Sequence, residues 1–200
     1  MLYSTTMLWF CHMWHIIRAM KPFDALRASG ETAPYRHGPS FPARTLYEMD
    51  LLEGKIFDWG CGFGVDLAYF RGKGFTAEGW DPVHKKETPP STFAPESFNL
   101  VHCAFVLNTL ADPNERIKVL QQIHDFLPAN GHLSLTVRSE SDISAHKKPT
   151  WKKYGDGWIT TKGTFQRGYT AEQLVKVITP LYKDIIVIAR NPLFVIASPS

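Results

Sequence analysis

Short apolar runs alternate along the chain with segments in which apolar residues recur every three or four positions. Runs of the first kind predict buried strands, and segments of the second kind predict amphipathic helices. The predicted strands cover residues 55–59, 75–81, 98–107, 132–138, 184–190 and 193–198. Because strands and helices alternate, we expect an α/β fold built on a doubly wound, mostly parallel sheet.

The last two predicted strands have the pattern of a hairpin. Only Asn191 and Pro192, a turn signal, separate residues 184–190 from residues 193–198. A hairpin reverses the chain at the end of a parallel sheet, so we expect one antiparallel strand at or near the edge.

Two of the predicted helices begin with capping signals. Asp112 is a suitable cap, Pro113 suits the first helical position, and Glu115 has the spacing of a capping box. Thr170 and Gln173 have the same spacing at the start of a later helix. In the earlier helix, the apolar stripe expected to face the core consists of Ile117, Leu120, Ile123 and Leu127.

The chain divides into two parts. Residues 1–43 combine an apolar stretch, expected to be a helix, with an irregular arm rich in proline. Residues 44–200 have the pattern of one globular domain with a basic, aromatic insert at 139–169. The apolar stretch lacks the early positive charge of an export signal and contains too many polar residues to span a membrane. We expect it to pack on the domain or on a second copy in a homo-oligomer, or to be an extension ahead of a start at Met20.

Composition and charge exclude several classes of protein. The net charge of +3 and the isoelectric point of about 8.7 are mildly basic, short of the balance typical of a dedicated nucleic-acid binder. The three cysteines form no C-x-x-C pair, so neither a disulfide framework nor a metal site is expected. A cytoplasmic protein is the simplest expectation.

The run DWGCGFG at residues 58–64 is the most informative segment, because it lies where the first strand ends and the first helix of the sheet begins. Glycines there let the backbone turn tightly and approach a ligand. Asp81 ends the next strand, where an acid can accept hydrogen bonds from both hydroxyls of a ribose. A turn or cap before Pro82 is the alternative role for Asp81. Val65 stands where a nicotinamide-dinucleotide fingerprint has glycine or alanine, which favours another adenosine ligand.

These motifs resemble those of the class I S-adenosylmethionine-dependent methyltransferases. The run at 58–64 matches the D-x-G-x-G-x-G motif, Asp81 matches the acid of the second motif, and FLPANGHLSLTV (126–137) matches a later stretch. The resemblance implies a Rossmann-like methyltransferase fold, S-adenosyl-L-methionine as cofactor and methyl transfer as the reaction. It implies that the glycine turn faces the methionine part of the cofactor, that Asp81 faces the ribose and that 104–106 line the methyl-transfer site. The implied cofactor-binding residues are Asp58, Gly60, Cys61, Gly62, Asp81, Pro82, Ala104, Phe105 and Val106.

Within that family, longer segments are similar to the methyltransferases associated with DNA phosphorothioation. The likeness covers roughly residues 36–196 and includes FDWGCGFGVD, GWDP, FVLNTLADPNER and DGWITTKGTFQRGYTAEQL. Phe63 and Val65 depart from it, because those proteins often have a basic and an acidic residue there. These two differences argue against a shared substrate more than against a shared cofactor.

The connection between Asp81 and Phe98 is shorter than in ordinary members, which fit a helix and another strand there. Four prolines fall within residues 82–96, and they exclude a normal helix. We therefore expect a sheet shortened by this strand, with adenine held mainly by apolar packing and backbone.

No catalytic residue is evident, and Asn108 is the candidate. It follows the third strand, where acceptors approach in this family, and its amide could orient an acceptor; capping of a helix or loop is the alternative. Arg36 or Arg44 could pair with the methionyl carboxylate or be solvated charges of the arm. His102 lies within a predicted strand, where a core histidine is expected rather than a base.

The insert provides the only hint about the acceptor. Its basic residues lie between aromatic ones, an arrangement that suits phosphate contact and base stacking, although a solvated loop is the alternative. The acceptor is therefore either a nucleic acid or a small molecule, and a catalytically silent cofactor-binding module within a DNA-modification assembly is the alternative function. The basic residues are Lys147, Lys148, Lys152 and Lys153.

Overall fold

The computed structural model describes residues 28–200. The apolar helix expected at the start of the chain, and the homo-oligomer contact expected of it, lie outside the described residues. Within residues 28–200, no helix is both long enough and apolar enough to cross a membrane.

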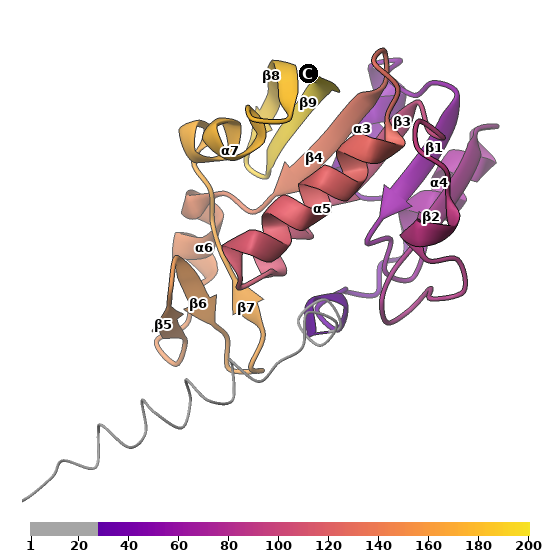
Figure 1. The fold of residues 1–200 in the computed structure, drawn as a ribbon. Helices are drawn as coiled ribbons and strands as arrows, with labels where there is room; N and C mark the ends of the chain where they lie inside the picture. The colour runs from indigo at the N-terminus through magenta and orange to yellow at the C-terminus, as the bar shows by residue number, and fades with distance from the viewer. Residues whose placement is uncertain (1–27) are drawn as a thin grey trace, which may run out of the picture.

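Six strands form the central sheet. They are β1 (Lys55–Trp59), β2 (Thr76–Trp80), β3 (Leu100–Ala104), β4 (His132–Val137), β8 (Tyr182–Arg190) and β9 (Leu193–Pro199). Their order in the sheet is β2-β1-β3-β4-β9-β8 (Figure 1). The first four pair in parallel, whereas β9 runs antiparallel to both β4 and β8. The predicted mostly parallel sheet with an antiparallel hairpin is confirmed.

Helices cover both faces of this sheet. They are α3 (Phe41–Glu48), α4 (Val65–Gly72), α5 (Pro113–Phe126) and α7 (Ala171–Ile178). Helices α5 and α7 share one core with Phe57 and Val101, whereas α3 and α4 share the other with Ile56 and Leu100. Neighbouring residues of one strand belong to different cores because successive side chains point to opposite faces. Figure 1 shows α5 lying along its face of the sheet.

The capping signals were partly right. Asp112 caps α5, and Thr170 and Gln173 form a complete capping box at α7, as predicted. The capping box predicted at α5 is wrong, because the carboxylate of Glu115 accepts a hydrogen bond from Lys118 Nζ at 2.8 Å. Lysine supplies a charged partner on the adjacent helical turn, and the glutamate takes it in preference to the cap backbone.

The buried stripe of α5 also differs from the predicted one. Leu120, Ile123 and Leu127 are buried, but Ile117 is 50% exposed. Arg116 is buried instead, with 2% of its surface exposed. A buried guanidinium needs charged or carbonyl partners, and its charged partner, Asp156, is distant in the sequence, so helical periodicity alone could not indicate it.

The connection between Asp81 and Phe98 contains neither an α-helix nor a strand of the sheet. Its one regular element is the short 3₁₀ turn η1 (Pro90–Thr92). Phe93 packs edge-on against Phe57 and Phe98, with ring centroids 5.3 and 5.1 Å apart. The predicted shortening is confirmed, and aromatic packing covers this end of the core.

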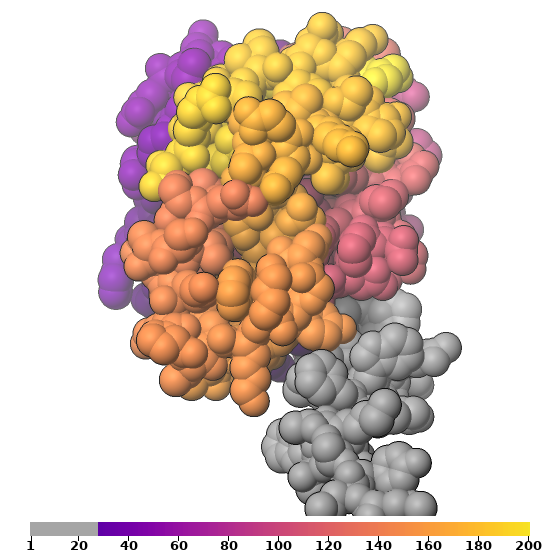
Figure 2. Space-filling model, turned by 90° about the vertical axis from the view of Figure 1, so that its left-hand side faces the viewer, coloured from indigo at the N-terminus to yellow at the C-terminus, as the bar shows by residue number. Residues whose placement is uncertain are grey.

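The basic, aromatic insert at residues 139–169, for which a solvated loop was the alternative, contains elements of its own. Helix α6 (Glu140–His146) follows β4, and β5 (Lys152–Tyr154), β6 (Gly157–Ile159) and β7 (Phe165–Gln166) form a small antiparallel sheet. These strands are too short to show a period in the sequence. Figure 2 shows the insert, in orange, forming the face below the yellow C-terminal segments.

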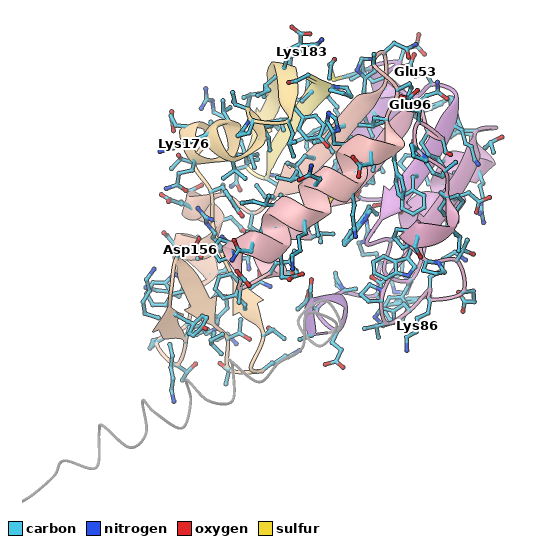
Figure 3. All side chains as sticks on the ribbon, in the orientation of Figure 1. Glu53, Lys86, Glu96, Asp156, Lys176 and Lys183 are labelled. Atoms are coloured by element: carbon cyan, nitrogen blue, oxygen red, sulfur yellow. The ribbon has the colours of Figure 1, made fainter. Side chains whose placement is uncertain are left out.

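An ion-pair cluster fastens the small sheet to α5. Asp156, in the turn between β5 and β6, accepts hydrogen bonds from Arg116 at 2.6 and 2.9 Å and lies 2.6 Å from Arg167. Figure 3 shows Asp156 between the small sheet and the N-terminal end of α5. The backbone N–H of Arg167 donates to the Asn108 carbonyl at 2.8 Å. The insert is thereby held as a wall beside the segment that follows β3.

Candidate functional site

A cavity of about 500 Å³ lies at the carboxyl ends of the parallel strands. Parallel strands end at one edge of a sheet, so the segments that follow β2, β1, β3 and β4 meet there in that order. The cofactor residues implied by the resemblance and the catalytic candidate all line this cavity: Asp58, Gly60, Cys61, Gly62, Asp81, Pro82, Ala104, Phe105, Val106 and Asn108. The structure brings these residues together, and their roles toward a ligand stay predictions. The other candidates, Arg44 and the insert lysines Lys147, Lys148, Lys152 and Lys153, are not among the residues that line the cavity.

The glycine turn after β1 adopts a backbone conformation that favours glycine. Gly60, Gly62 and Gly64 have φ values of 75°, 53° and 77°. The N–H of Gly60 donates to the Trp80 carbonyl at 2.8 Å, which ties the turn to the end of β2. A Cβ on Gly60 would lie 2.4 Å from Val106 Cγ2. The turn therefore packs directly against the segment after β3, and a larger residue at position 60 would deform this wall of the cavity.

Asp81 organises the loop that follows β2. One carboxylate oxygen accepts hydrogen bonds from the N–H groups of Val83 and His84, both at 2.9 Å, and the other accepts from Gly62 N at 3.1 Å. The turn role considered for Asp81 is therefore realised, beside its place in the cavity. An ionised carboxylate offers about four acceptor positions, so roughly one remains for a ligand. Asp81 can therefore accept a hydrogen bond from one ribose hydroxyl, rather than from both as the sequence predicted.

Asp58, the residue before the last in β1, has a buried carboxylate. Its side chain is 3% exposed, and Oδ2 has no hydrogen-bond partner among residues 28–200. Burial raises the pKa of this carboxyl to about 7, although the nearby His102 opposes the shift. A buried carboxylate with an unpaired oxygen favours a cationic or hydrogen-donating ligand.

Asp66, in the first turn of α4, is a cavity residue that the sequence interpretation missed. It accepts hydrogen bonds from both terminal nitrogens of Arg36 at 3.0 Å and from Ser40 N at 2.7 Å, and His102 Nε2 lies 3.6 Å away. Burial opposes its ionisation, but His102 and Arg36 outweigh burial and hold the pKa of Asp66 well below its usual range. An acid in the first turn of the helix that follows a glycine run is the signal that could have indicated it.

The arm before α3 forms part of the cavity lining, and the two arginines considered for the methionyl carboxylate, Arg36 in the arm and Arg44 in α3, both have protein partners. Arg36 makes the two-pronged contact with Asp66, whereas Arg44 donates to the Pro39 carbonyl at 2.7 Å. Arg36 would have to leave Asp66 before its terminal nitrogens could meet another carboxylate, whereas Arg44 is exposed. His102 is fully buried, with Nδ1 at 3.0 Å from Ser134 Oγ, as expected of a core histidine.

The end of the cavity beside the insert has amide and guanidinium groups. Asn108 lies in η2 (Leu107–Thr109), is 1% exposed and donates from Nδ2 to Gln166 Oε1 at 3.4 Å. Arg138, which follows β4, donates to the same oxygen at 3.3 Å. Gln166 comes from β7, so the insert contributes a residue to the cavity that no sequence pattern had singled out for a role.

The charges of the cavity differ between its two ends. Near β1 and β2 lie three buried carboxylates, those of Asp58, Asp66 and Asp81, with Arg36 as their cation. This end suits a ligand that carries positive charge. Within residues 28–200, no cluster of three or more histidine, cysteine or acidic residues could hold a metal ion.

A family model described as a methyltransferase domain matches residues 36–176. The match covers more than half of the chain and includes the glycine turn, Asp81 and Asn108. The chain belongs to the methyltransferase domain family. A comparison with curated protein sequences found no match.

Solved structures similar to this methyltransferase domain share its fold at low identity. The PH0226 protein of Pyrococcus horikoshii is 12% identical, with a TM-score of 0.64 over 78% of this chain and 89% of its own. A SAM-dependent methyltransferase of Methanosarcina mazei is 18% identical, with a TM-score of 0.58 over 76% and 96%. The 1,6-didemethyltoxoflavin-N1-methyltransferase of Burkholderia thailandensis, solved with S-adenosylhomocysteine, is 15% identical, with a TM-score of 0.57 over 80% and 76%.

S-adenosylmethionine, the predicted cofactor, is the cofactor of this class of methyltransferase domain. The cavity fits it on two observations. The unpaired Oδ2 of the buried Asp58 can meet its ammonium group, and the glycine turn leaves out the side chains that would fill the space beside Val106. The carboxylates at this end match the net positive charge of the cofactor.

Proposed function

We propose that this methyltransferase domain is an active S-adenosylmethionine-dependent methyltransferase. The observation that carries the proposal is the buried Asp58 carboxylate, with an unpaired oxygen, placed beside the glycine turn in the lined cavity. An unpaired buried carboxylate costs free energy unless a ligand pairs it, so a functional role explains its presence.

The residues of the first cavity end would bind the cofactor. Asp58 would meet its ammonium group, the turn at Gly60 and Gly62 would let the methionine part approach the backbone, and Asp81 would accept one ribose hydroxyl. The backbone of 104–106 would border the reacting methyl group. When bound, the cofactor would supply a methyl group on a sulfonium. A nucleophilic atom of the acceptor would bond to the methyl carbon in line as the carbon–sulfur bond breaks, leaving S-adenosylhomocysteine.

The protein's contribution to such a reaction is alignment and the exclusion of water. A base is required only when the acceptor must lose its proton to become a nucleophile. Asn108 has no acid–base function, but its buried amide can orient an acceptor. The fixed wall of the insert closes the side of the cavity beside it.

Calorimetric titration with S-adenosylmethionine tests the proposal directly, with NAD as the control ligand. We expect micromolar binding of the first and none of the second. A folded sample that binds neither would overturn the proposal. Appearance of S-adenosylhomocysteine during incubation with a cell extract would then establish turnover, and binding without turnover would favour the silent module.

The alternative to a small-molecule acceptor is a nucleic acid, in the setting of a DNA-modification assembly. The segments similar to the methyltransferases associated with DNA phosphorothioation, together with the exposed lysines of the insert, support action on nucleic acid or membership of a DNA-modification assembly. Incubation with DNA and labelled cofactor measures this activity, and transfer only to small molecules of the extract would contradict it.

A further inference from the structure

The cavity end at β3 and β4 contains one connected polar cluster. Its members are Asn108, Arg138, Asp142 and Gln166, which come from separate segments and all line the cavity. Arg138 Nε donates to Asp142, Arg138 donates through a terminal nitrogen to Gln166 Oε1, and Asn108 Nδ2 donates to that same oxygen. The insert is therefore coupled to the residue that follows β3.

The cluster determines which way its two amides point. Arginine can only donate hydrogen bonds, so Gln166 must present its oxygen to Arg138. That oxygen also faces Asn108, so Asn108 must present its NH₂ group to Gln166. The Oδ1 atom of Asn108 then points away from Gln166. It has no hydrogen-bond partner among the described residues, although the Asn108 residue is only 1% exposed. A ligand with an N–H or O–H group would provide the missing donor.

The one arginine of the cluster is already paired with a carboxylate. The Arg138 guanidinium is paired with the Asp142 carboxylate, which also lies 2.9 Å from His146 Nδ1. A phosphate placed here would therefore meet an arginine that is already neutralised. The chemistry favours an uncharged acceptor over an anionic one.

We propose that this cluster is the acceptor subsite, and that it takes an uncharged polar small molecule that donates an N–H or O–H hydrogen bond to Asn108 Oδ1. The proposal rests on the proposed function, because the cofactor would occupy the other end of the cavity. Asn108 contacts the acceptor, whereas Gln166 and Arg138 are positioning residues that orient its amide.

A matched pair of probes isolates the donor requirement. Uracil carries ring N–H groups, and 1,3-dimethyluracil keeps the ring and carbonyls but replaces those hydrogens with methyl groups. The full chain, loaded with S-adenosylhomocysteine, is titrated with each probe and followed by NMR. We expect uracil to bind about tenfold more tightly than 1,3-dimethyluracil, the scale of one buried hydrogen bond. Equal affinities, or no binding of either, would overturn the proposal.

Three variants test whether the preference for uracil over 1,3-dimethyluracil depends on Asn108 Oδ1. Asn108→Ala should remove the tenfold preference. Gln166→Glu should retain it, because a carboxylate still accepts from both Arg138 and Asn108. Asn114→Ala changes an exposed asparagine of α5 and should have no effect. A preference that survives in Asn108→Ala, with an unchanged melting temperature, contradicts the assignment. If Asn108→Ala is unfolded, loss of the preference in Gln166→Glu contradicts it instead.

Two further measurements separate the proposal from its competitors. S-adenosylmethionine affinity, measured by calorimetry, should be unchanged in Asn108→Ala, so a failure of the subsite can be distinguished from a failure of the proposed function. Uridine 5′-monophosphate and a single-stranded oligonucleotide should bind no more tightly than uracil. Tighter binding of either would show that phosphate is recognised, and the uncharged acceptor would be wrong.

Discussion

The two ends of the cavity are built in different ways. At β1 and β2, the cofactor end uses a continuous glycine turn whose positive φ values follow from local sequence, although the turn also contacts Val106 and Trp80. At β3 and β4, the other end depends on a wall of very short strands held by Arg116, Asp156 and Arg167. The first is local and rigid by backbone geometry, whereas the second is assembled from distant charges. Perturbing each end separately should therefore affect different properties of the protein.

The largest effect is expected at Gly60. In Gly60→Ala the new Cβ would lie 2.4 Å from Val106 Cγ2, in a left-handed backbone conformation. We expect the free energy of unfolding to fall by about 3 kcal/mol and cofactor affinity to fall by more than about 100-fold. Calorimetry and denaturant unfolding measure the two effects.

Gly72→Ala is the matched control, because a Cβ on that residue of α4 meets nothing within 4 Å. It should leave cofactor affinity unchanged and raise stability by up to about 1 kcal/mol. If Gly60→Ala and Gly72→Ala changed cofactor affinity and stability to a similar extent, the glycine turn would have no special role.

Removing the ion-pair cluster that fastens the insert to α5 is expected to have the next largest effect. Arg116→Leu removes hydrogen bonds to Asp156 and to the carbonyl groups of Leu110 and Ala111. We expect the free energy of unfolding to fall by about 2 kcal/mol, with faster amide hydrogen exchange in β5, β6 and β7. Cofactor affinity should differ from that of the wild type by less than about threefold, because the glycine turn does not contact the ion-pair cluster.

Arg71→Leu is the control for this variant. Arg71 is half exposed, lies 3.7 Å from Glu78 and donates from Nε to the Ala77 carbonyl at 2.8 Å. Its loss should cost about 1 kcal/mol and leave exchange in the insert unchanged. A collapse of cofactor affinity in Arg116→Leu would contradict the independence of the two cavity ends.

Asp58 should produce a smaller, pH-dependent effect at the cofactor end. Its folded pKa of about 7 lies above the unfolded value, so its contribution to stability is present below about pH 4 and is lost as pH rises through 7. We expect Asp58→Asn to exceed the wild type in unfolding free energy at pH 8 by on the order of 2 kcal/mol, and by less at pH 5.

Cofactor binding should show the opposite trend with pH. A bound ammonium group favours ionised Asp58, so wild-type affinity should rise between pH 6 and 8, by at most about tenfold per pH unit. In Asp58→Asn this rise should disappear. A parallel pH profile in both proteins would assign the titration to another group.

The cofactor end could be predicted because its signals are local. A glycine run between a strand and a helix, followed by an acid at the end of the next strand, needs no knowledge of distant residues. Four prolines likewise predicted the shortened connection. Asp66 was missed because its importance arises from Arg36 and His102, which lie far from it in the sequence.

At the acceptor end, the sequence singled out Asn108, but its partners could not be predicted, for the same physical reason. Gln166 and Arg138 acquire their roles only when β7 is brought beside Asn108, and Ile117 is exposed because Arg116 occupies the buried position through Asp156. Binary hydrophobic patterning treats an arginine as a surface residue and has no way to identify its buried partner. The insert was therefore interpreted as a polar stretch, although it forms a helix and a sheet.

The smallest effect on the folded protein is expected from the lysines of the insert. Lys147 and Lys153 lie 3.8 and 4.9 Å from the ring centroid of Trp158, contacts that contribute under about 1 kcal/mol at an exposed site. Because two lysines already lie over Trp158, a base would have to displace them to stack there. We expect alanine at positions 147, 148, 152 and 153 to leave cofactor affinity and small-molecule turnover unchanged.

The control carries four substitutions elsewhere: Lys86→Ala, Lys118→Ala, Lys176→Ala and Lys183→Ala. Figure 3 shows Lys86, Lys176 and Lys183 at well-separated places away from the insert. Both variants lose the same charge, so oligonucleotide binding that depends only on net charge should weaken equally in both. A steeper loss in the insert variant, with a smaller salt dependence than in the wild type, would instead mark a specific phosphate surface. That result would favour a nucleic acid over the small acceptor inferred from Asn108.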